Sequence, residues 1–399
     1  MQYIADLHIH SPYSRACSPL LSLENISKRC EEKGIDIIST GDFSHPIWFK
    51  NLKNNLIEIG NDNGLYIIKN NYYKVSFILG TELSLVYKDK DKVRRIHLVI
   101  LAPNLDSAER LNNYLSRNFN IKYDGRPIIK MQADKLVNLC LKINPQFLIY
   151  PAHIWTPWYS ILGSKSGFDN FKDCFKSELK NIYAYETGIS SDPDMNSRVS
   201  LLNNLTSLSN SDAHSLETIG REANIFKLKN LNYKSIYKAI VNNNILASIE
   251  SFSKLGLYYF DGHRKCNFSC RPEESRKLNN TCPVCDKPLT IGVLNRVEEL
   301  TKNKTIKNAN RKYFQSLSLR QLIAFSKNIK NINSQKVSLI YNKLIFEFKN
   351  EFNILLFQDL NKLSSFLDNK AIKLLKLSRE NKLNIKPGYD GRPGEIVNL

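Results

Sequence analysis

The stretch Asp6-Leu7-His8-Ile9-His10-Ser11 decides how the rest of this 399-residue chain is interpreted. It continues an apolar run that begins at Tyr3 and has the character of a β-strand. Alternate residues of a strand point to the same side, so the imidazoles of His8 and His10 can face one metal ion. The stretch therefore predicts a metal site where the first strand ends.

The other histidines repeat this pattern along the chain. His45 comes just after a second strand-like run, His97 opens a later one, and His153 follows another. With His214, six of the seven histidines are expected at strand edges. A single histidine is usually a satisfied structural residue. Six of them beside three acidic residues predict metal ligation instead, and these acids are Asp42, Glu82 and Asp212.

Strand-like and helix-like segments alternate from residue 1 to about residue 255. The strand-like segments are 3–7, 35–38, 75–79, 96–101 and 147–150, with helix-like segments such as 23–33 and 105–119 between them. This alternation predicts an α/β fold with a parallel sheet, and the number of units favours a barrel. The active site of such a barrel gathers at the C-terminal ends of its strands.

The mixture of imidazole and carboxylate ligands is typical of sites for Zn²⁺, Mn²⁺ or Fe²⁺ rather than of thiolate sites. The set exceeds the needs of one ion, so we expect two or three divalent ions, with Zn²⁺, Mg²⁺ and Mn²⁺ as candidates. Adjacent ions clamp a phosphate, stabilise the leaving oxygen and generate hydroxide from bound water. Phosphoester hydrolysis is therefore the reaction class that these residues predict.

Four of the eight cysteines form two close pairs, Cys266-x3-Cys270 and Cys282-x2-Cys285. Two thiolate pairs joined by a short loop predict a closed, tetrahedral, structural Zn²⁺ site. In an intracellular protein, thiols stay reduced and a metal is favoured over disulfides. His263 is a possible substitute ligand that the fourth cysteine makes unnecessary. The alternative is four unrelated free cysteines, and Pro283 within the second pair argues against it.

The net charge of +19 is concentrated toward the end of the chain. Residues 261–399 hold 26 Lys and Arg against 13 Asp and Glu, whereas residues 1–260 hold 31 against 25. A concentrated positive field attracts polyanions such as nucleic acid. Lysine enrichment from a biased genome is the alternative reading of this charge. No apolar run reaches the roughly 20 residues that a spanning helix needs, and the first residues do not form a signal peptide, so no membrane partner is expected.

The ordered motifs resemble those of the polymerase-and-histidinol-phosphatase (PHP) superfamily. The resemblance rests on the stretch 6–11, the stretch 42–45, Glu82, His97, His153 and the stretch 212–214. It implies a distorted (β/α)7 barrel that hydrolyses phosphoesters with up to three metal ions. It also implies three ligand sets, which are His8, His10, Glu82 and Asp212; Glu82, His97 and His153; and His214 with Asp42 or His45. Many relatives carry a further histidine several residues after the first pair. The corresponding stretch of this chain, residues 13–18, contains no histidine, and this difference concerns the third ligand set.

The order of the parts is similar to that of the endonuclease Q family of DNA repair nucleases. Matching strings run over nearly the whole chain, at 6–11, 14–16, 40–46, 124–127, 151–158, 186–192, 211–214, 220–224, 289–293 and 387–391, while 392–394 departs from the family. The resemblance implies cleavage of DNA on the 5′ side of deaminated bases (hypoxanthine, uracil, xanthine) and of abasic sites. The catalytic roles fall to Glu82, Asp212 and His214.

An enzyme that inspects a base must flip it into a pocket and stack it on flat side chains. The candidates for substrate contact are Tyr13, Ser14, Arg15, Trp155, Trp158, Glu186 and Arg221. Ordinary rim packing is the alternative for the aromatic residues, and ion pairing with residues such as Glu222 is the alternative for the arginines. Glu186 either bonds a base edge or orients a ligand histidine.

Three parts are expected: a phosphoesterase barrel over residues 1–258, a four-cysteine zinc module over 259–300, and a basic, mainly helical DNA-binding region over 301–399. The main alternative function is a PHP-type phosphatase for a small phosphomonoester, although such a substrate needs neither the module nor the basic region. A non-enzymatic DNA-binding protein is a third possibility, against which the near-complete ligand set argues. The expected partner is damaged DNA in the cytoplasm, at the nucleoid. A replication-clamp partner is left open, because the termini show no convincing clamp-binding peptide.

Overall fold

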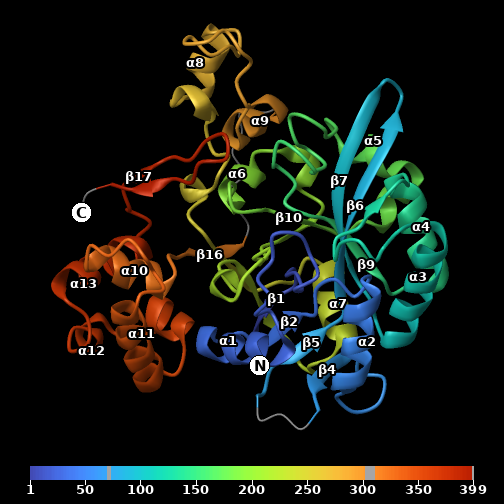
Figure 1. The fold of residues 1–399 in the computed structure, drawn as a ribbon, viewed down its shortest axis with the longest axis horizontal. Coiled ribbons are helices and arrows are strands. Elements are labelled where there is room, and N and C mark those ends of the chain that lie inside the picture. Colours follow the sequence, from blue (N-terminus) through green and yellow to red (C-terminus); the bar gives the residue numbers. More distant parts are fainter. Residues whose placement is uncertain (70–72, 302–310, 398–399) are drawn as a thin grey trace.

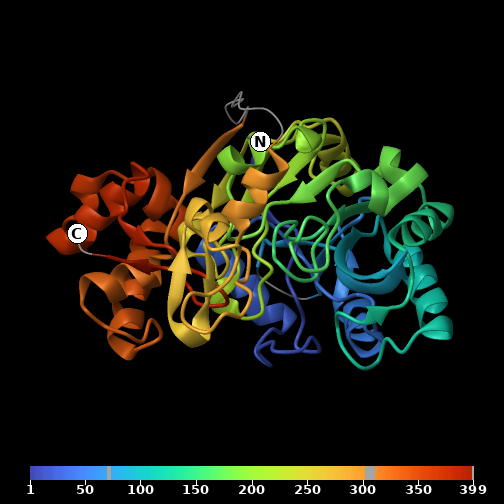
Figure 2. The same ribbon diagram turned by 90° about the horizontal axis from the view of Figure 1, so that it is seen from above.

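The computed structural model describes residues 1–69, 73–301 and 311–397. Figure 1 shows three parts, with the first forming the body of the molecule, the cysteine-bearing module rising above it, and the C-terminal helices packed at one side. The view from above shows the same C-terminal helices beyond one end of the body (Figure 2). None of the helices in the described ranges is long and apolar enough to cross a membrane.

The first part is built on two main sheets, which makes the fold a mixed α/β fold. The eight-stranded sheet has the order β16-β13-β12-β1-β2-β5-β4-β3. Its strands are β1 (Gln2–Asp6), β2 (Ile37–Ser39), β3 (Leu56–Glu58), β4 (Leu65–Ile68), β5 (Ser76–Ile78), β12 (Ala223–Lys227), β13 (Ala247–Glu250) and β16 (Lys312–Gln315). The four-stranded sheet has the order β8-β6-β7-β9, with β6 (Gly80–Asp89), β7 (Lys92–Leu101), β8 (Ile128–Ile129) and β9 (Leu148–Pro151). A separate pair consists of β10 (Ala184–Glu186) and β11 (Thr206–Leu208).

The expectation of a parallel sheet is correct for only some of the strand pairs. β1 and β2 are parallel, as are β2 and β5, but β1 pairs antiparallel with β12, and β7 pairs antiparallel with both β6 and β9. The register of β6 and β7 leaves only Lys90 and Asp91 between them, and a two-residue turn can join only antiparallel strands. The hairpin also corrects the placement of His97, which lies within β7 rather than at its start, because polar residues from Lys92 onward pair with β6.

Polar side chains bridge the gap between β11 and β1. The backbone N–H of Leu7 donates to Asn210 Oδ1 over 3.0 Å, and the N–H of Ser209 donates to Asn224 Oδ1 over 3.0 Å. Both asparagines are buried. Buried backbone groups at strand ends need such partners, because an unpaired one costs free energy. The strand ends around the first histidines are therefore held together by side chains as well as by sheet pairing.

Helices cover the sheets of the first part, and all of those named below except α4 begin at a residue whose side chain caps the helix. The first, α1 (Leu23–Lys33), starts at the Ser22 side chain and ends at Gly34, whose φ of 89° is in the left-handed region. This agrees with the segment expected from the sequence, because both caps are local signals. The others are α2 (Pro46–Asn55), α3 (Leu105–Asn118), α4 (Ala133–Ile143), α5 (Phe171–Phe175), α6 (Pro193–Ser197) and α7 (Tyr233–Val241).

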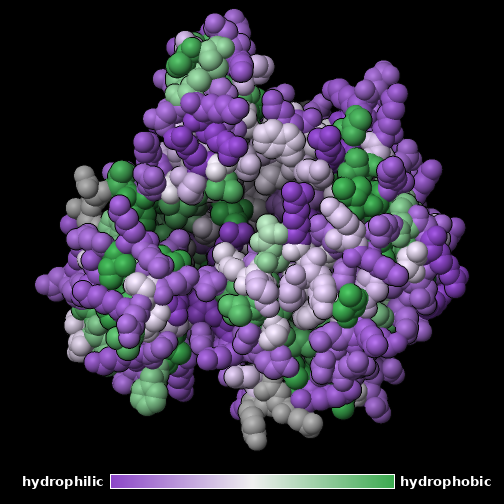
Figure 3. Space-filling model, viewed as in Figure 1, coloured by the Kyte–Doolittle hydropathy of each residue, from purple (hydrophilic) through white to green (hydrophobic). Residues whose placement is uncertain are grey.

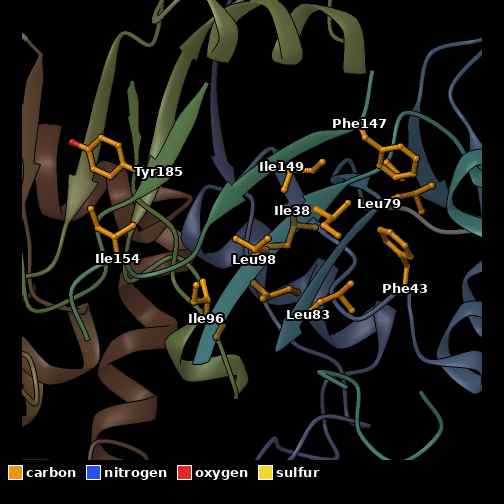
Figure 4. Close-up of a cluster of buried hydrophobic side chains, with 14 of the residues drawn as sticks. Ile38, Phe43, Leu79, Leu83, Ile96, Leu98, Phe147, Ile149, Ile154 and Tyr185 are labelled. Atoms are coloured by element: carbon orange, nitrogen blue, oxygen red, sulfur yellow. The ribbon is translucent and has the colours of Figure 1, made fainter. Parts of the chain in front are cut away.

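Apolar side chains from several strands meet beneath these helices. Ile38, Leu79, Leu83, Leu98 and Ile149 come from or adjoin β2, β5, β6, β7 and β9 and gather into one cluster (Figure 4). All of them are at most 1% exposed. Burial of apolar surface is the main favourable contribution to folding, so this cluster fixes the strand ends that carry the polar residues described below.

The module and the C-terminal region follow the first part. The module contains β14 (Asp261–His263), β15 (Phe268–Cys270), α8 (Pro272–Lys277) and α9 (Val293–Leu300). The C-terminal region has its own apolar core and consists of α10 (Leu319–Ser326), α11 (Gln335–Phe348), α12 (Leu360–Leu363), α13 (Asn369–Arg379), β17 (Ile385–Lys386) and β18 (Glu395–Ile396). Its described residues are mainly helical, as the sequence predicts.

A buried ion pair joins the C-terminal region to the first part. Glu351 accepts from Lys33 Nζ over 2.7 Å, and both side chains are at most 2% exposed. Tyr341 from α11 donates to Glu351 over 3.0 Å and accepts from Arg29 over 2.6 Å. Burial lowers the pKa of Lys33, while the nearby Glu351 carboxylate counteracts that effect. The contact therefore joins α1 to the last third of the chain through groups that are costly to bury unpaired.

Candidate metal centre

Two groups of histidine and carboxylate side chains come together in the first part of the molecule, and they share Glu82. The first group is His8, His10, Glu82 and Asp212, and the second is Glu82, His97 and His153. Glu82 Oε1 lies 3.0 Å from His97 Nδ1 and 3.2 Å from His153 Nε2. Its other oxygen, Oε2, lies 3.4 Å from His10 Nε2. These groups correspond to the first two ligand sets that the family resemblance implies.

The residues of the first group fit a metal ion. His8 Nε2 and Glu82 Oε1 are buried side-chain atoms without a hydrogen-bond partner in the described part of the chain. They lie 3.7 Å apart. Two ligands about 2.0–2.2 Å from a tetrahedral ion are about 3.4 Å apart. One ion can therefore satisfy both atoms, which would otherwise be costly to bury.

A second layer of side chains orients the ligand histidines. Glu186, from the end of β10, lies 2.9 Å from His8 Nδ1, so it leaves Nε2 of that ring facing the site. Asp42 does the same for His10 at 3.0 Å, and Thr156 lies 3.1 Å from His153 Nδ1. Contacts of this kind fix the tautomer and the direction of a ligand histidine.

The charges in this centre are strongly coupled. Burial would lower the pKa of His10, but the Asp42 carboxylate and hydrogen bonds to Asp212 and Asp42 raise it to about 9. Burial lowers the pKa of His97 to about 4, so this ring is neutral at pH 7, as a ligand must be. Burial would raise the pKa of Glu82, yet nearby charges, with His97 foremost, hold it well below its ordinary value. Glu82 is therefore an ionised carboxylate at the middle of the centre.

Three site residues have unusual backbone conformations. The φ angles of Asp42, His153 and Asp212 are 46°, 28° and 47°, all in the left-handed region. Such conformations are uncommon for residues other than glycine and cluster at functional sites. Gly188 lies against His153, where a Cβ would come within 2.9 Å of the His153 Cβ. The chain therefore holds these side chains in place by constrained backbone rather than by rotamer choice alone.

The third ligand set is not brought together. No group beyond the two above and the module's group gathers three such ligands within residues 1–69, 73–301 and 311–397. Asp42 Oδ2 accepts hydrogen bonds from both Ser11 and Ser14, at 2.6 and 2.8 Å. Both ring nitrogens of His45 are occupied, since Nδ1 caps α2 at Trp48 and Nε2 lies 3.2 Å from Lys122 O. His214 Nδ1 lies 2.8 Å from the backbone oxygen of Asp212.

The residues expected to touch substrate divide into exposed and buried sets. Tyr13 and Trp158 are 38% and 36% exposed, and Tyr13 stacks on His45 with ring centroids 4.4 Å apart. Arg15 is also exposed. Trp155, however, is 2% exposed and donates to Asn196 Oδ1, so the packing alternative describes its position. Ser14 lies 4% exposed against Asp42.

The structure also places Glu186 and Arg221 away from the expected contacts. Glu186 is fully buried behind His8, so its position matches the orienting alternative rather than contact with a base. Arg221 Nε donates to the backbone oxygen of Ser211 over 2.7 Å, which ties it to the strand end that carries Asp212. Both side chains support the metal centre from behind.

Arg126 is a site residue that the sequence analysis did not single out. Its Nη1 lies 3.2 Å from Glu82 Oε2, and its side chain is 22% exposed. The only signal in the sequence is its place in the family string 124–127. Asp6 was missed as well. It is buried and accepts from the backbone N–H groups of Ser211 and Gly220, each over 3.0 Å, so it positions the Asp212 loop.

The cysteine-bearing module gathers a metal-binding group that differs from the expected one in one ligand. The group is His263, Cys266, Cys282 and Cys285, and His263 Nδ1 lies 3.4 Å from Cys285 Sγ. Cys270 adjoins Cys282 in a small apolar cluster and is 6% exposed. Three thiolates and one imidazole form a normal structural zinc set. The structure therefore supports a metal site in the module while placing His263 where the fourth cysteine was expected.

One family model and two curated relatives match this chain. Residues 318–382 match the model described as the MJ0043 C-terminal domain. The uncharacterized protein MJ0043 of Methanocaldococcus jannaschii is 33% identical over 250 residues, which cover 61% of this chain but only 31% of that protein. The uncharacterized protein YqxK of Bacillus subtilis is 28% identical over 410 residues, which cover 98% of each protein. The chain thus spans about a third of the first relative and nearly all of the second.

Two solved structures match over the whole fold. The lesion-specific endonuclease PfuEndoQ from Pyrococcus furiosus has a TM-score of 0.87 at 29% identity, covering 99% of this chain and 95% of that one. A complex of endonuclease Q with a 27-mer duplex, which carries an abasic lesion at the active site, has a TM-score of 0.88 at 29% identity, with 99% and 96% covered.

The fold and the histidine–carboxylate centre together define a metal-dependent phosphodiesterase of the nuclease class. Within that class the chain is similar over its whole length to endonuclease Q, in agreement with the resemblance of its motifs.

Proposed function

We propose that this protein is a DNA repair endonuclease that hydrolyses the phosphodiester on the 5′ side of a deaminated base or an abasic site. The observation that carries the proposal is the pair of ligand groups sharing Glu82 in a chain whose whole length superposes on a lesion-specific endonuclease. The products would be a 3′-hydroxyl and a 5′-phosphate. The proposal includes the PHP-type (β/α)7 barrel as the framework of residues 1–258, followed by the module over 259–300 and the basic region over 301–399.

The two ligand groups, which share Glu82, would each hold one divalent ion. Bound there, such ions supply Lewis acidity toward the phosphate and a nucleophile from water. The chain's own contribution is to orient the ligands: Glu186 directs His8, Asp42 directs His10, and Asp212 completes the first group. His214 lies beside this group, 3.7 Å from Asp212 Oδ1, and keeps its proposed catalytic role. A third ion would be held by His214 with Asp42 or His45, both of which have other partners in this structure.

The exposed aromatic residues near the centre support a base pocket. Tyr13 and Trp158 are partly exposed, and stacking on aromatic side chains holds an extruded base. Arg15, two residues after Tyr13 in the sequence, is exposed as well, and its guanidinium is suited to binding a phosphate. We propose these three residues as substrate contacts and assign Ser14, Trp155, Glu186 and Arg221 to the supporting structure.

The shape of the molecule is consistent with a long polyanionic substrate. A recess lies where the body, the module and the C-terminal helices meet, and mainly hydrophilic residues cover the face around it (Figure 3). Because truncation of the C-terminal region would leave Lys33 without Glu351, substitution of exposed lysines tests DNA binding better. Lys336 and Lys343 lie on the exposed side of α11. The variants to measure are therefore Lys336→Gln and Lys343→Gln. When a lysine that contacts a phosphate is replaced, the slope of log binding constant against log salt concentration should become shallower by about one.

Nicking of defined duplexes tests the proposal. The protein is incubated with Mg²⁺, Mn²⁺ or Zn²⁺ and with labelled duplexes that contain one deoxyinosine, one deoxyuridine, one abasic site or no lesion. A nick on the 5′ side of the lesion supports the proposal. Release of phosphate from a small phosphomonoester without nicking supports the phosphatase alternative, and DNA binding without turnover supports a non-enzymatic role.

A further inference from the structure

Arg126 has an unusual position for a cation, because it points into a centre that is built to hold cations. Its Nη1 lies 3.2 Å from Glu82 Oε2, the carboxylate shared by both ligand groups. With Glu82 foremost, the carboxylates of Asp212 and Asp124 also raise the pKa of Arg126. A structural explanation would be that Arg126 simply neutralises Glu82.

The loop that carries Arg126 is fixed from several sides. The backbone N–H of Gly125 donates to Tyr13 O over 3.0 Å, and Gly125 O accepts from Ser44 Oγ over 3.3 Å. The N–H of Arg126 donates to Asp124 Oδ1 over 3.0 Å. A Cβ on Gly125 would come within 2.5 Å of Asp42 Oδ2, so only glycine lets the loop approach this closely. The guanidinium is therefore delivered to the centre by a firmly held backbone.

Charge balance argues against a purely neutralising role. With an ion in each ligand group, Glu82 would be a ligand of both, and the ligand histidines would be neutral. Two divalent ions would bring four positive charges, against which stand the carboxylates of Glu82, Asp212, Asp42 and Glu186. Arg126 adds a further positive charge, so the loaded centre would have an excess of about one. A bound phosphodiester carries one negative charge, which matches this excess, and the same cations would stabilise the further charge that develops as the attacking oxygen adds.

We propose that Arg126 is a phosphate-binding residue, which exchanges Glu82 for a non-bridging oxygen of the scissile phosphate when ions and substrate are bound. This inference rests on the proposed phosphodiesterase function. Guanidinium groups suit the role because their rigid fork matches two phosphate oxygens and never loses its charge. With 22% of the side chain exposed, the group lies at the mouth of the centre, where it can reach an incoming phosphate. No proton or electron transfer by Arg126 is required.

Three measurements on Arg126→Gln and Arg126→Lys test the proposal, with Arg110→Gln on the exposed side of α3 as the matched control. The first is calorimetric binding of inorganic phosphate to the Mn²⁺-loaded protein, where Arg126→Gln should bind about 10- to 100-fold more weakly. The second is metal content by mass spectrometry, which should be unchanged or higher, because a cation competing for Glu82 has been removed. The third is hydrolysis of bis(p-nitrophenyl) phosphate, where kcat should fall about 100-fold and Arg126→Lys should recover part of the loss.

The outcomes separate this inference from the proposed function. Phosphate affinity that is unchanged in Arg126→Gln, while the wild-type protein nicks lesion duplexes, overturns the role of Arg126 and leaves the nuclease in place. Loss of metal in Arg126→Gln, in proportion to the loss of activity, shows a structural role and also overturns it. If the wild type fails to nick lesion DNA but binds phosphate through Arg126, the nuclease proposal fails and the phosphate site stands.

Discussion

Replacing Glu82 with glutamine should remove both ions of the proposed centre at once. Glu82 Oε1 lies within 3.2 Å of His97 and His153, and Oε2 lies 3.4 Å from His10. Glutamine keeps the shape but loses the charge and turns one ligand oxygen into an NH₂ group. Loss of a residue that only orients a ligand weakens metal binding about 10- to 100-fold. Loss of this shared ligand should therefore weaken the binding of each ion by more than about 100-fold.

The assay is metal stoichiometry by mass spectrometry after desalting, together with nicking of a lesion duplex. The wild type should retain three ions, one for each of the three ligand groups. Glu82→Gln should retain only the module ion, whereas Asp212→Asn, which touches only the first group, should retain two and still bind DNA without cleaving it. Glu109→Gln, an exposed residue of α3, is the control and should retain all three. If Glu82→Gln and Asp212→Asn each lose a single ion, Glu82 is not shared and the reasoning is refuted.

Further predictions concern the module, the pH dependence and the joint between the parts. His263→Ala should lose the module zinc, whereas Cys270→Ser should keep it. The zinc content of each variant is measured after dialysis, and the reverse result would show that the four cysteines are the ligands. Burial raises the pKa of Glu250 from 4.5 to about 7, so the folded protein binds this proton more tightly than the unfolded chain does. The resulting stabilisation is complete below pH 4.5 and is lost as the pH rises through 7. The melting temperature should therefore fall between pH 5 and 8, and Glu250→Gln should flatten that fall; an equal slope in the variant counts against this carboxyl. Glu351→Gln leaves the buried Lys33 ammonium without a counter-charge and should cost about 3–5 kcal/mol of unfolding free energy, measured by denaturant titration; a loss below about 1 kcal/mol would show that water reaches the pair.

The sequence predicts the parts of this structure that are encoded locally. The bounds of α1 follow from Ser22 and Gly34, and the ligands of both metal groups are residues that the sequence singles out, although Glu82 and His97 lie within strands. What the sequence could not predict depends on contacts between distant segments. Glu186 meets His8 across 178 residues, and nothing in the local pattern distinguishes an orienting carboxylate from a substrate-binding one.

The errors have the same physical origin. Trp155 looks like a stacking residue because it follows His153 closely, yet its indole turns into the core. The hairpin of β6 and β7 was missed because the polar residues around Lys90 resemble a loop until pairing satisfies their backbone. His263 and Cys270 both lie near the cluster, and only the fold of the module decides which one faces the other thiols.

The Lys33–Glu351 pair has a consequence for the newly made chain. Its two residues are separated by 318 positions, and ribosomes add about 5–20 residues per second. For roughly 15–60 s after α1 emerges, the Lys33 ammonium lacks the carboxylate that later accompanies it into the interior. During that interval α1 cannot reach its final packing without burying a bare charge, so the last stage of folding awaits synthesis of the C-terminal helices. A ribosome stalled before residue 351 should therefore hold a body whose first helix remains sensitive to proteases.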